Sequence, residues 1–112
     1  MRDDQARLRD IAEAIEKIGR YAGIGRDHFD QDELVQTWMV YHLQVIREGV
    51  TQLSDSVRSQ HPDIPWRATA AMRHALVHAY FRVDLDEVWN AVQSDLPPLQ
   101  VRIRKLLSPA SK

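Results

Sequence analysis

The stretch that decides the fold is residues 30–59, DQDELVQTWMVYHLQVIREGVTQLSDSVRS. Its apolar residues recur three and four positions apart, which is the spacing of side chains on one helical face. A helix that is apolar on two sides lies at the centre of a bundle or is shared with another chain. We therefore expect one long helix, running to about Arg58 or Ser59, in an all-α protein. The two faces are Leu34, Trp38, Tyr41, Val45 and Leu53, and, offset from them, Val35, Met39, Ile46 and Val50.

The predicted start of this long helix carries two capping signals. Asp30 stands three residues before Glu33, as the two polar positions of a capping box do. Phe29 and Leu34 occupy the positions of a hydrophobic staple around that cap. Inside the helix, Gly49 costs up to about 1 kcal/mol relative to alanine. We expect close packing or a bend at this glycine.

An amphipathic helix is predicted before this stretch, from about Asp3 to Tyr21. Its apolar residues alternate three and four positions apart, so that they form one stripe. The Gly23-Ile24-Gly25 tripeptide after it predicts a turn. The stripe consists of Leu8, Ile11, Ile15, Ile18 and Ala22.

Two further helices are predicted on either side of residues 83–92. His61–Pro65 holds two prolines and marks a break, after which Trp66 opens a helix that ends near Tyr80. Asp95-Leu96-Pro97-Pro98 is expected to restart the chain into a final helix, because proline is tolerated in the first helical turn.

A short helix is expected between these two. Asp84 and Glu87 repeat the spacing of a capping box, and Val83 and Val88 stand where a staple would pack. Together the segments predict an all-α, up-and-down bundle of four to five helices. It forms a single domain over residues 1–107, followed by a flexible tail at 108–112.

Composition narrows the possible functions. The length of 112 residues is typical of one domain, and the formal net charge of −1 does not indicate a nucleic-acid-binding protein. Cysteine is absent, which rules out disulfides, thiolate metal sites and a cysteine nucleophile. No apolar run approaches the roughly 20 residues of a membrane-spanning helix, and the charged start shows no secretory signal. We expect a cytoplasmic protein without a membrane contact.

The chemically unusual stretch is RHALVHAY, Arg73 to Tyr80. It places four polar or titratable side chains on an apolar helical segment, where such groups are costly to bury unless paired or used. In an ideal helix Arg73 and His78 diverge by roughly 140°. They would converge if the helix ended early, if the arginine curled round, or if a second copy of the chain completed the site.

Three interpretations of this stretch remain open from the residues alone. The first is an ordinary helix with a core histidine and a surface arginine. The second is a metal site from His74 and His78, which share a face, although two ligands are too few and no glutamate accompanies them. The third is cleavage of RNA by its own 2′-hydroxyl, with histidine moving protons and arginine stabilising the phosphorane.

The stretch resembles the R-x4-6-H signature of HEPN domains. With Tyr80 it becomes Arg-x4-His-x-Tyr, which is similar to the HepT-like toxins that pair with the nucleotidyltransferase antitoxin MntA. The resemblance spans nearly the whole chain and is densest over residues 62–107. The matching flanks are Ile64-Pro65-Trp66, Met72-Arg73, Val77 to Phe81, Val83-Asp84-Leu85, Val88-Trp89 and Asp95-Leu96-Pro97.

The resemblance implies a homodimeric, metal-independent endoribonuclease that needs no cofactor. Arg73 and His78 would be the catalytic pair facing a second copy, with His74 as a polar auxiliary where the family more often has asparagine. Glu48 would orient the arginine. Tyr80 would be the site at which the antitoxin attaches AMP, and the added negative charge beside the cleft would repel RNA.

The alternative function is a non-catalytic helical subunit of a nucleotidyltransferase complex that binds nucleotide or substrate. The net charge of −1 mildly favours it. For the dimer interface, we expect the second face of the long helix (Val35, Met39, Ile46, Val50) together with the helix that carries RHALVHAY.

Overall fold

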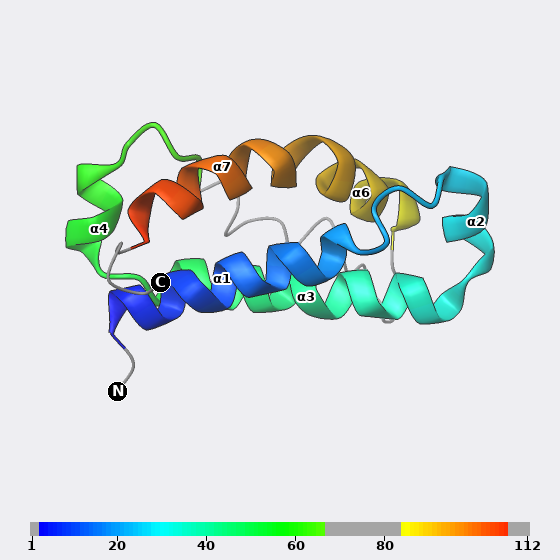
Figure 1. Cartoon of the computed structure of the whole chain (residues 1–112), viewed down its shortest axis with the longest axis horizontal. Helices are drawn as coiled ribbons and strands as arrows, with labels where there is room; N and C mark the ends of the chain where they lie inside the picture. Colours follow the sequence, from blue (N-terminus) through cyan, green and yellow to red (C-terminus); the bar gives the residue numbers. More distant parts are fainter. Residues whose placement is uncertain (1–2, 67–83, 108–112) are drawn as a thin grey trace.

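The computed structural model describes residues 3–66 and 84–107, and all structural statements below concern these residues. Every regular element among them is helical, which confirms the all-α fold class. Helices α1 and α3 run antiparallel along the length of the molecule, and α6, η2 and α7 form one rod across them (Figure 1). The elements are α1 Asp4–Gly19, α2 Arg26–Gln31, α3 Glu33–Gln52, α4 Asp55–Gln60, α6 Leu85–Asn90, the π-helix η2 Ala91–Asp95 and α7 Leu96–Leu106.

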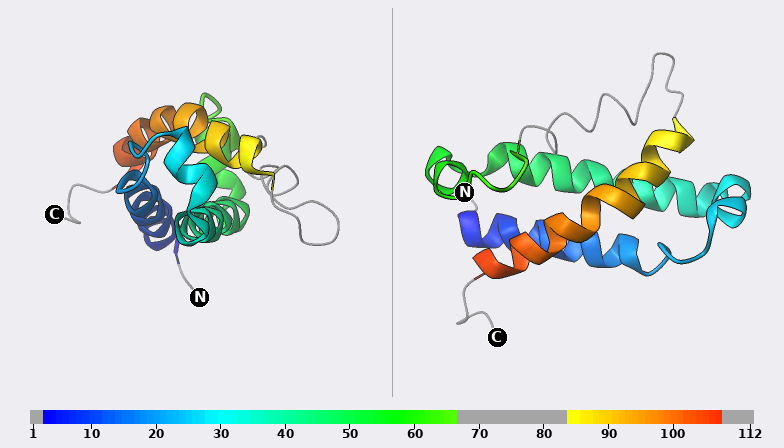
Figure 2. Two further views of the ribbon diagram at one scale, coloured as in Figure 1. Left: turned by 90° about the vertical axis from the view of Figure 1, so that its right-hand side faces the viewer. Right: turned by 90° about the horizontal axis from the view of Figure 1, so that it is seen from above.

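The core lies where α1, α3 and the α6–α7 rod meet (Figure 2). Helix α1 begins as predicted, since Asp3 caps it by accepting a hydrogen bond from the Ala6 amide at 2.8 Å. Its predicted stripe is confirmed at the four positions that fall inside the helix. These buried residues are Leu8, Ile11, Ile15 and Ile18.

The predicted start of the long helix is wrong. The cap of α3 is Asp32, whose Oδ1 accepts from the Val35 amide at 3.2 Å, whereas Asp30 lies inside α2. The predicted staple fails too, because Phe29 is fully buried and Leu34 is 83% exposed. Burial of the Phe29 ring requires the separate turn of α2, and that turn moves the start of the next helix two residues along the chain.

The predicted end of the long helix is also wrong. Helix α3 ends at Gln52, and an extended Leu53 leads to Ser54, which caps a separate helix α4. The carboxylate of Asp4 accepts hydrogen bonds from the Ser54 amide at 2.9 Å and from its hydroxyl at 2.7 Å. These bonds lower the pKa of Asp4. A contact between residues fifty positions apart therefore ends the helix, and periodicity cannot reveal it.

The two apolar faces of α3 take different roles from those predicted. The second face, expected at a dimer interface, lies inside the protomer: Met39, Ile46 and Val50 are fully buried. The outward side of α3 instead carries Leu34 and Tyr41, which are 83% and 60% exposed. The expectation that the second face meets another chain is therefore wrong.

Close packing at Gly49 is confirmed. A β-carbon built there would stand 2.6 Å from Cγ1 of Ile11, which is closer than real contacts allow. Helix α3 thus approaches α1 through a glycine, and the helix stays continuous through this position.

The rod of α6, η2 and α7 confirms two predictions and adds one feature that was not predicted. Asp84 caps α6 as predicted, accepting from the Glu87 amide at 3.2 Å. The final helix α7 begins at Leu96 with its prolines in the first turn, as predicted. The unpredicted feature is the π-helical turn before it, in which the Leu96 amide donates to the Ala91 carbonyl. Pro97 lacks the amide that a regular α-helical turn would use, and the wider turn keeps the rod continuous. None of the described helices combines the length and hydropathy needed to cross a membrane.

Candidate functional site

The expected catalytic pair Arg73 and His78 lies outside the described residues, as do the expected auxiliary His74 and the expected modification site Tyr80. Their roles and convergence therefore remain predictions. Of the expected site residues, the structure places only Glu48. The structure also shows the two ends of the frame that holds residues 67–83.

The frame before residue 67 is a compact, anchored loop. Trp66 is buried, and its indole N–H donates to the His61 carbonyl at 3.0 Å. Two backbone bonds tighten the same turn, from the Ile64 amide to the His61 carbonyl at 3.2 Å and from the Trp66 amide to the Ile64 carbonyl at 2.8 Å. Ile64 is itself buried in the core. The chain thus enters the candidate segment from a fixed point.

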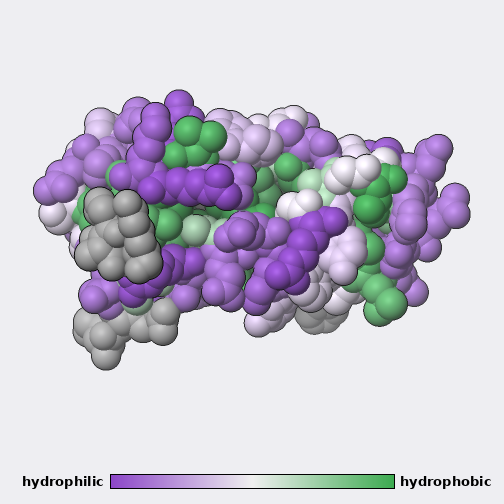
Figure 3. Space-filling model, viewed as in Figure 1, coloured by the Kyte–Doolittle hydropathy of each residue, from purple (hydrophilic) through white to green (hydrophobic). Residues whose placement is uncertain are grey.

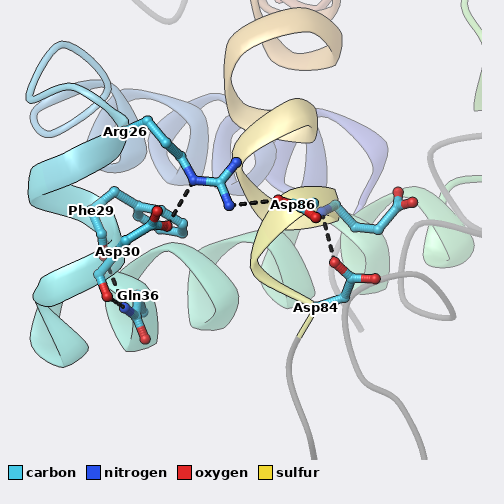
Figure 4. A network of polar contacts seen from close by, with 7 residues as sticks. Arg26, Phe29, Asp30, Gln36, Asp84 and Asp86 are labelled. Carbon is cyan, nitrogen blue, oxygen red and sulfur yellow. Dashed lines mark hydrogen bonds and ion pairs between the residues drawn. The ribbon is translucent and has the colours of Figure 1, made fainter.

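The frame after residue 83 is a charged clamp between α2 and α6. The guanidinium of Arg26 lies between two carboxylates, with Nε 2.7 Å from Asp30 and Nη2 2.5 Å from Asp86 (Figure 4). Both bonds favour the charged form and raise the pKa of Arg26. Asp84, which caps α6, stands directly after the candidate segment.

An apolar contact reinforces this clamp. The Phe29 ring from α2 packs on Trp89 of α6, with ring centroids 5.1 Å apart. Gln36 of α3 donates from its side-chain amide to the Phe29 carbonyl at 2.8 Å and to the Asp30 carbonyl at 3.2 Å. Residues from three helices thus hold the end of the chain that leaves the candidate segment.

Glu48 stands on the exposed side of α3. Its side chain is 61% exposed, and its Oε1 accepts from Nη1 of Arg47 at 2.8 Å. It borders a groove of about 400 Å³ between α1 and α3, to which Arg7, Asp10 and Tyr41 also contribute. A solvent-facing carboxylate with a single arginine partner has lone pairs left for a second guanidinium. Its contact with Arg73 remains a prediction.

His42 is a titratable residue that the sequence reasoning did not single out. It is buried on α3, with ring centroids 4.6 Å from Trp38 and 4.9 Å from Tyr41. Burial lowers its pKa, and the nearby positive charge of Lys17 adds to the effect. The spacing Trp38-x3-His42, which places both rings on one helical face, was the available signal. His42 is a core residue whose burial disfavours its charged form.

Within residues 3–66 and 84–107, no three His, Asp or Glu side chains gather closely enough to hold a metal ion.

The geometry defines an all-α bundle in which two anchored ends hold a short segment rich in arginine and histidine. The chain matches the family model described as ribonuclease HepT-like over residues 11–106. It is similar to a protein named "Probable ribonuclease HepT" from Thermococcus cleftensis, with 39% identity over 100 residues, 88% of this chain and 91% of that protein.

Two further relatives also carry ribonuclease names. A protein provisionally named an RNase in Caldanaerobacter subterraneus subsp. tengcongensis is 31% identical over 90 residues, 80% of each chain. Another from Methanocaldococcus jannaschii is 30% identical over 107 residues, 95% of this chain and 88% of that protein. No solved structure matches the chain significantly. The chain belongs to the ribonuclease HepT-like family.

Family membership confirms the resemblance and the prediction of a ribonuclease at the level of the family. The match covers the frame on both sides and the residues between, including Arg73 and His78. The roles of individual residues, the dimer and the antitoxin are matters for proposal.

Proposed function

We propose that this chain is the toxin of a toxin–antitoxin pair and acts as a metal-independent endoribonuclease. The single observation that carries the proposal is the family match over residues 11–106, which includes Arg-x4-His-x-Tyr at residues 73–80. The anchored loop at Trp66 and the capped start of α6 at Asp84 support it, because they hold both ends of that stretch.

The chemistry needs one base, one acid and one fixed positive charge. The 2′-hydroxyl of the RNA loses its proton to a base and attacks the adjacent phosphorus, and the bond to the 5′-oxygen breaks as an acid protonates it. This gives a 2′,3′-cyclic phosphate and a 5′-hydroxyl, and no redox partner or metal is consumed. His78 exchanges the protons, Arg73 stabilises the phosphorane, and His74 is the candidate for a second proton-transfer group.

A homodimer completes the proposed site. Arg73 and His78 diverge by roughly 140° on one ideal helix, so two copies around a two-fold axis supply the groups that one copy does not bring together. The described surface that suits a second copy is the outward side of α3, where Leu34 and Tyr41 are exposed. Glu48 lies on the exposed side of the same helix.

We propose that the antitoxin inactivates the toxin by modifying Tyr80. A nucleotidyltransferase antitoxin of the MntA type would transfer AMP to its phenolic oxygen, with release of pyrophosphate from ATP. The attached phosphate adds negative charge beside the cleft and repels RNA. Tyr80→Phe would retain cleavage and escape the antitoxin, whereas Tyr21→Phe would remain sensitive. Mass spectrometry of the co-expressed pair locates the modification, and AMP on another residue would contradict this assignment.

The nuclease proposal is tested by RNA cleavage with purified protein in excess EDTA. Arg73→Ala and His78→Ala should each lower the rate at least about a hundredfold, the usual scale for removing a proton-transfer or charge-stabilising group. Arg20→Ala and His28→Ala change the same residue types on the described surface and should leave cleavage intact. Circular dichroism shows that each variant folds.

Two results would overturn this site. Unchanged cleavage by both Arg73→Ala and His78→Ala would exclude the catalytic pair. Cleavage that EDTA abolishes would instead favour a metal site at His74 and His78. Absence of cleavage by the wild type, together with nucleotide binding, would favour the second candidate function, a non-catalytic subunit of a nucleotidyltransferase complex. The formal net charge of −1 is the observation that favours this second candidate.

A further inference from the structure

The charges of this chain are segregated. Residues 67–83 and helix α7 each contain three arginine or lysine residues and no aspartate or glutamate, whereas all sixteen acidic residues lie elsewhere. Among the described helices, α7 alone has more basic than acidic residues. A protein whose formal net charge is −1 therefore presents a local positive surface on α7, and such surfaces attract anions.

A groove lies against this basic helix. It encloses about 520 Å³ between α7 and the loop His61–Ile64. Arg102 and Lys105, three positions apart on α7, line one side of the groove. Ile64, Val101 and Leu106 supply apolar surface to the same groove, and hydrophilic residues surround apolar ones on the face that carries α7 (Figure 3).

The side chains of Arg102 and Lys105 have few interactions with other described residues. Arg102 is 40% exposed, and its contacts in the described part are an ion pair with Asp63 at 3.4 Å and a long bond to the Pro98 carbonyl at 3.5 Å. Lys105 is exposed, and its side chain makes no ion pair or hydrogen bond with another described residue. By contrast, Arg26 is clamped by two carboxylates. Arg102 and Lys105 thus retain free donors for an anionic ligand.

The groove lies beside the entry to the candidate segment. Its loop holds Trp66 through the His61 carbonyl at 3.0 Å. Arg73 follows Trp66 by seven residues, so even a fully extended chain keeps it within roughly 25 Å of this anchor. A strand of RNA that extends this far from the groove can therefore reach Arg73.

Helix stabilisation explains only part of this pattern. Basic residues in a last turn interact favourably with the helix dipole, and Arg104 and Lys105 occupy that turn. The dipole does not account for a groove with apolar walls, or for Arg102 one turn earlier. A single-stranded RNA presents both kinds of surface, phosphates for the cations and base faces for the apolar side chains.

We propose that the groove between α7 and the His61–Ile64 loop binds the sugar-phosphate backbone of the RNA substrate outside the cleavage site, with Arg102 and Lys105 on its phosphates. This inference rests on the proposed ribonuclease function and names how the substrate is held. Arg102 and Lys105 are positioning residues, and Asp63 opposes binding by occupying Arg102.

The test measures binding of a labelled single-stranded 2′-O-methyl RNA, which lacks the attacking hydroxyl, by fluorescence anisotropy at several salt concentrations. The double variant Arg102→Gln/Lys105→Gln should weaken binding roughly tenfold at low salt and reduce the slope of log K against log salt by about 1.4, two phosphate contacts at about 0.7 each. Asp63→Asn should strengthen binding. The matched control Lys17→Gln/Arg20→Gln also removes one lysine and one arginine, but at the C-terminal end of α1.

Cleavage of long RNA should show a raised KM and an unchanged kcat in the Arg102→Gln/Lys105→Gln variant, since the groove does not touch the reacting atoms. An unchanged affinity and salt slope, an equal loss in the Lys17→Gln/Arg20→Gln control, or no RNA binding by the wild type would overturn the inference. If only the ribonuclease proposal fails, the result is different: RNA binding depends on Arg102 and Lys105, but the wild type does not cleave the RNA.

Discussion

At Gly49, α3 packs closely against α1, and the effect of this glycine on stability can be measured. In an open helix, replacement by alanine stabilises by up to about 1 kcal/mol. Here the new methyl group would stand 2.6 Å from the Ile11 side chain, and overpacking a core costs about 1–3 kcal/mol. We predict that Gly49→Ala lowers the free energy of unfolding in urea.

Gly19 provides the matched control for this prediction. It ends α1, and a β-carbon there would meet nothing within 4 Å. Gly19→Ala should be neutral or slightly stabilising. Equal stability changes in the two variants would show that Ile11 moves aside without cost and that the contact is unimportant.

His42 predicts a pH dependence of stability. Burial lowers its pKa in the folded state, so the unfolded chain binds the proton more readily. The stability contributed by neutral His42 is then complete above its ordinary pKa of about 6.5 and is lost as the pH falls below that value. Urea unfolding at pH 5 and pH 7.5 should show lower stability at pH 5, and His42→Gln should reduce the difference. An unchanged difference would place the effect on other groups.

Asp4 adds a second loss of stability at lower pH. Hydrogen bonds from Ser54 lower the pKa of its carboxyl, so its contribution is complete above the ordinary value of about 3.9. It is lost as the pH falls through that range. The loss from Asp4 begins at a lower pH than the loss from His42. The contribution of His42 to stability can therefore be measured above the pH range in which Asp4 titrates.

At the scale of single elements, Phe29 and Leu34 test how α2 and α3 are held. Phe29 is fully buried against Trp89, and Leu34 is 83% exposed. Measured in the Tyr41→Asp background, which should be monomeric, Phe29→Ala should destabilise by about 3–5 kcal/mol, whereas Leu34→Ala should stay within about 0.5 kcal/mol. Thermal and urea unfolding measure both. Similar losses of stability in the two variants would indicate that Leu34 packs against Phe29, as the predicted hydrophobic staple requires.

The elements also show why some predictions succeeded. The Asp84 cap of α6 was predicted because its signal is local: one carboxylate and an amide three residues on. The start of α3 was not, because Asp30 and Asp32 offer alternative caps and the burial of Phe29 decides between them. The end of α3 depends on Asp4, fifty residues away. Local patterns cannot report such contacts.

The same limit applies to the candidate site. The pattern of Arg73, His78 and Tyr80 indicated its chemistry, and family membership agrees with a ribonuclease. The Arg26 clamp between α2 and α6 was beyond sequence reasoning, because its partner Asp86 lies sixty residues away. The apolar pattern of α3 likewise could not say which face turns outward.

At the scale of the whole molecule, the outward side of α3 predicts the assembly. If Tyr41 and Leu34 meet a second copy, a charge at Tyr41 is desolvated in the dimer and disfavours it. Light scattering should find the wild type dimeric and Tyr41→Asp shifted toward the monomer. Val101→Asp adds a charge at another exposed apolar side chain, on α7, and should leave the mass unchanged. A monomeric wild type would contradict the dimer proposal.

The first and last helices are joined at the same end of the bundle, where the Gln5 side-chain amide donates to the Leu106 carbonyl at 3.0 Å. A short peptide could connect these ends, because closing a short gap costs little chain entropy. Gly23 lies on an exposed turn where an added β-carbon would meet nothing within 4 Å, and such turns tolerate new termini. The molecule is thus suited to circular permutation, in which α2 would begin the chain and α1 would end it, at the cost of the bond from the Ile24 amide to the Tyr21 carbonyl that spans the break.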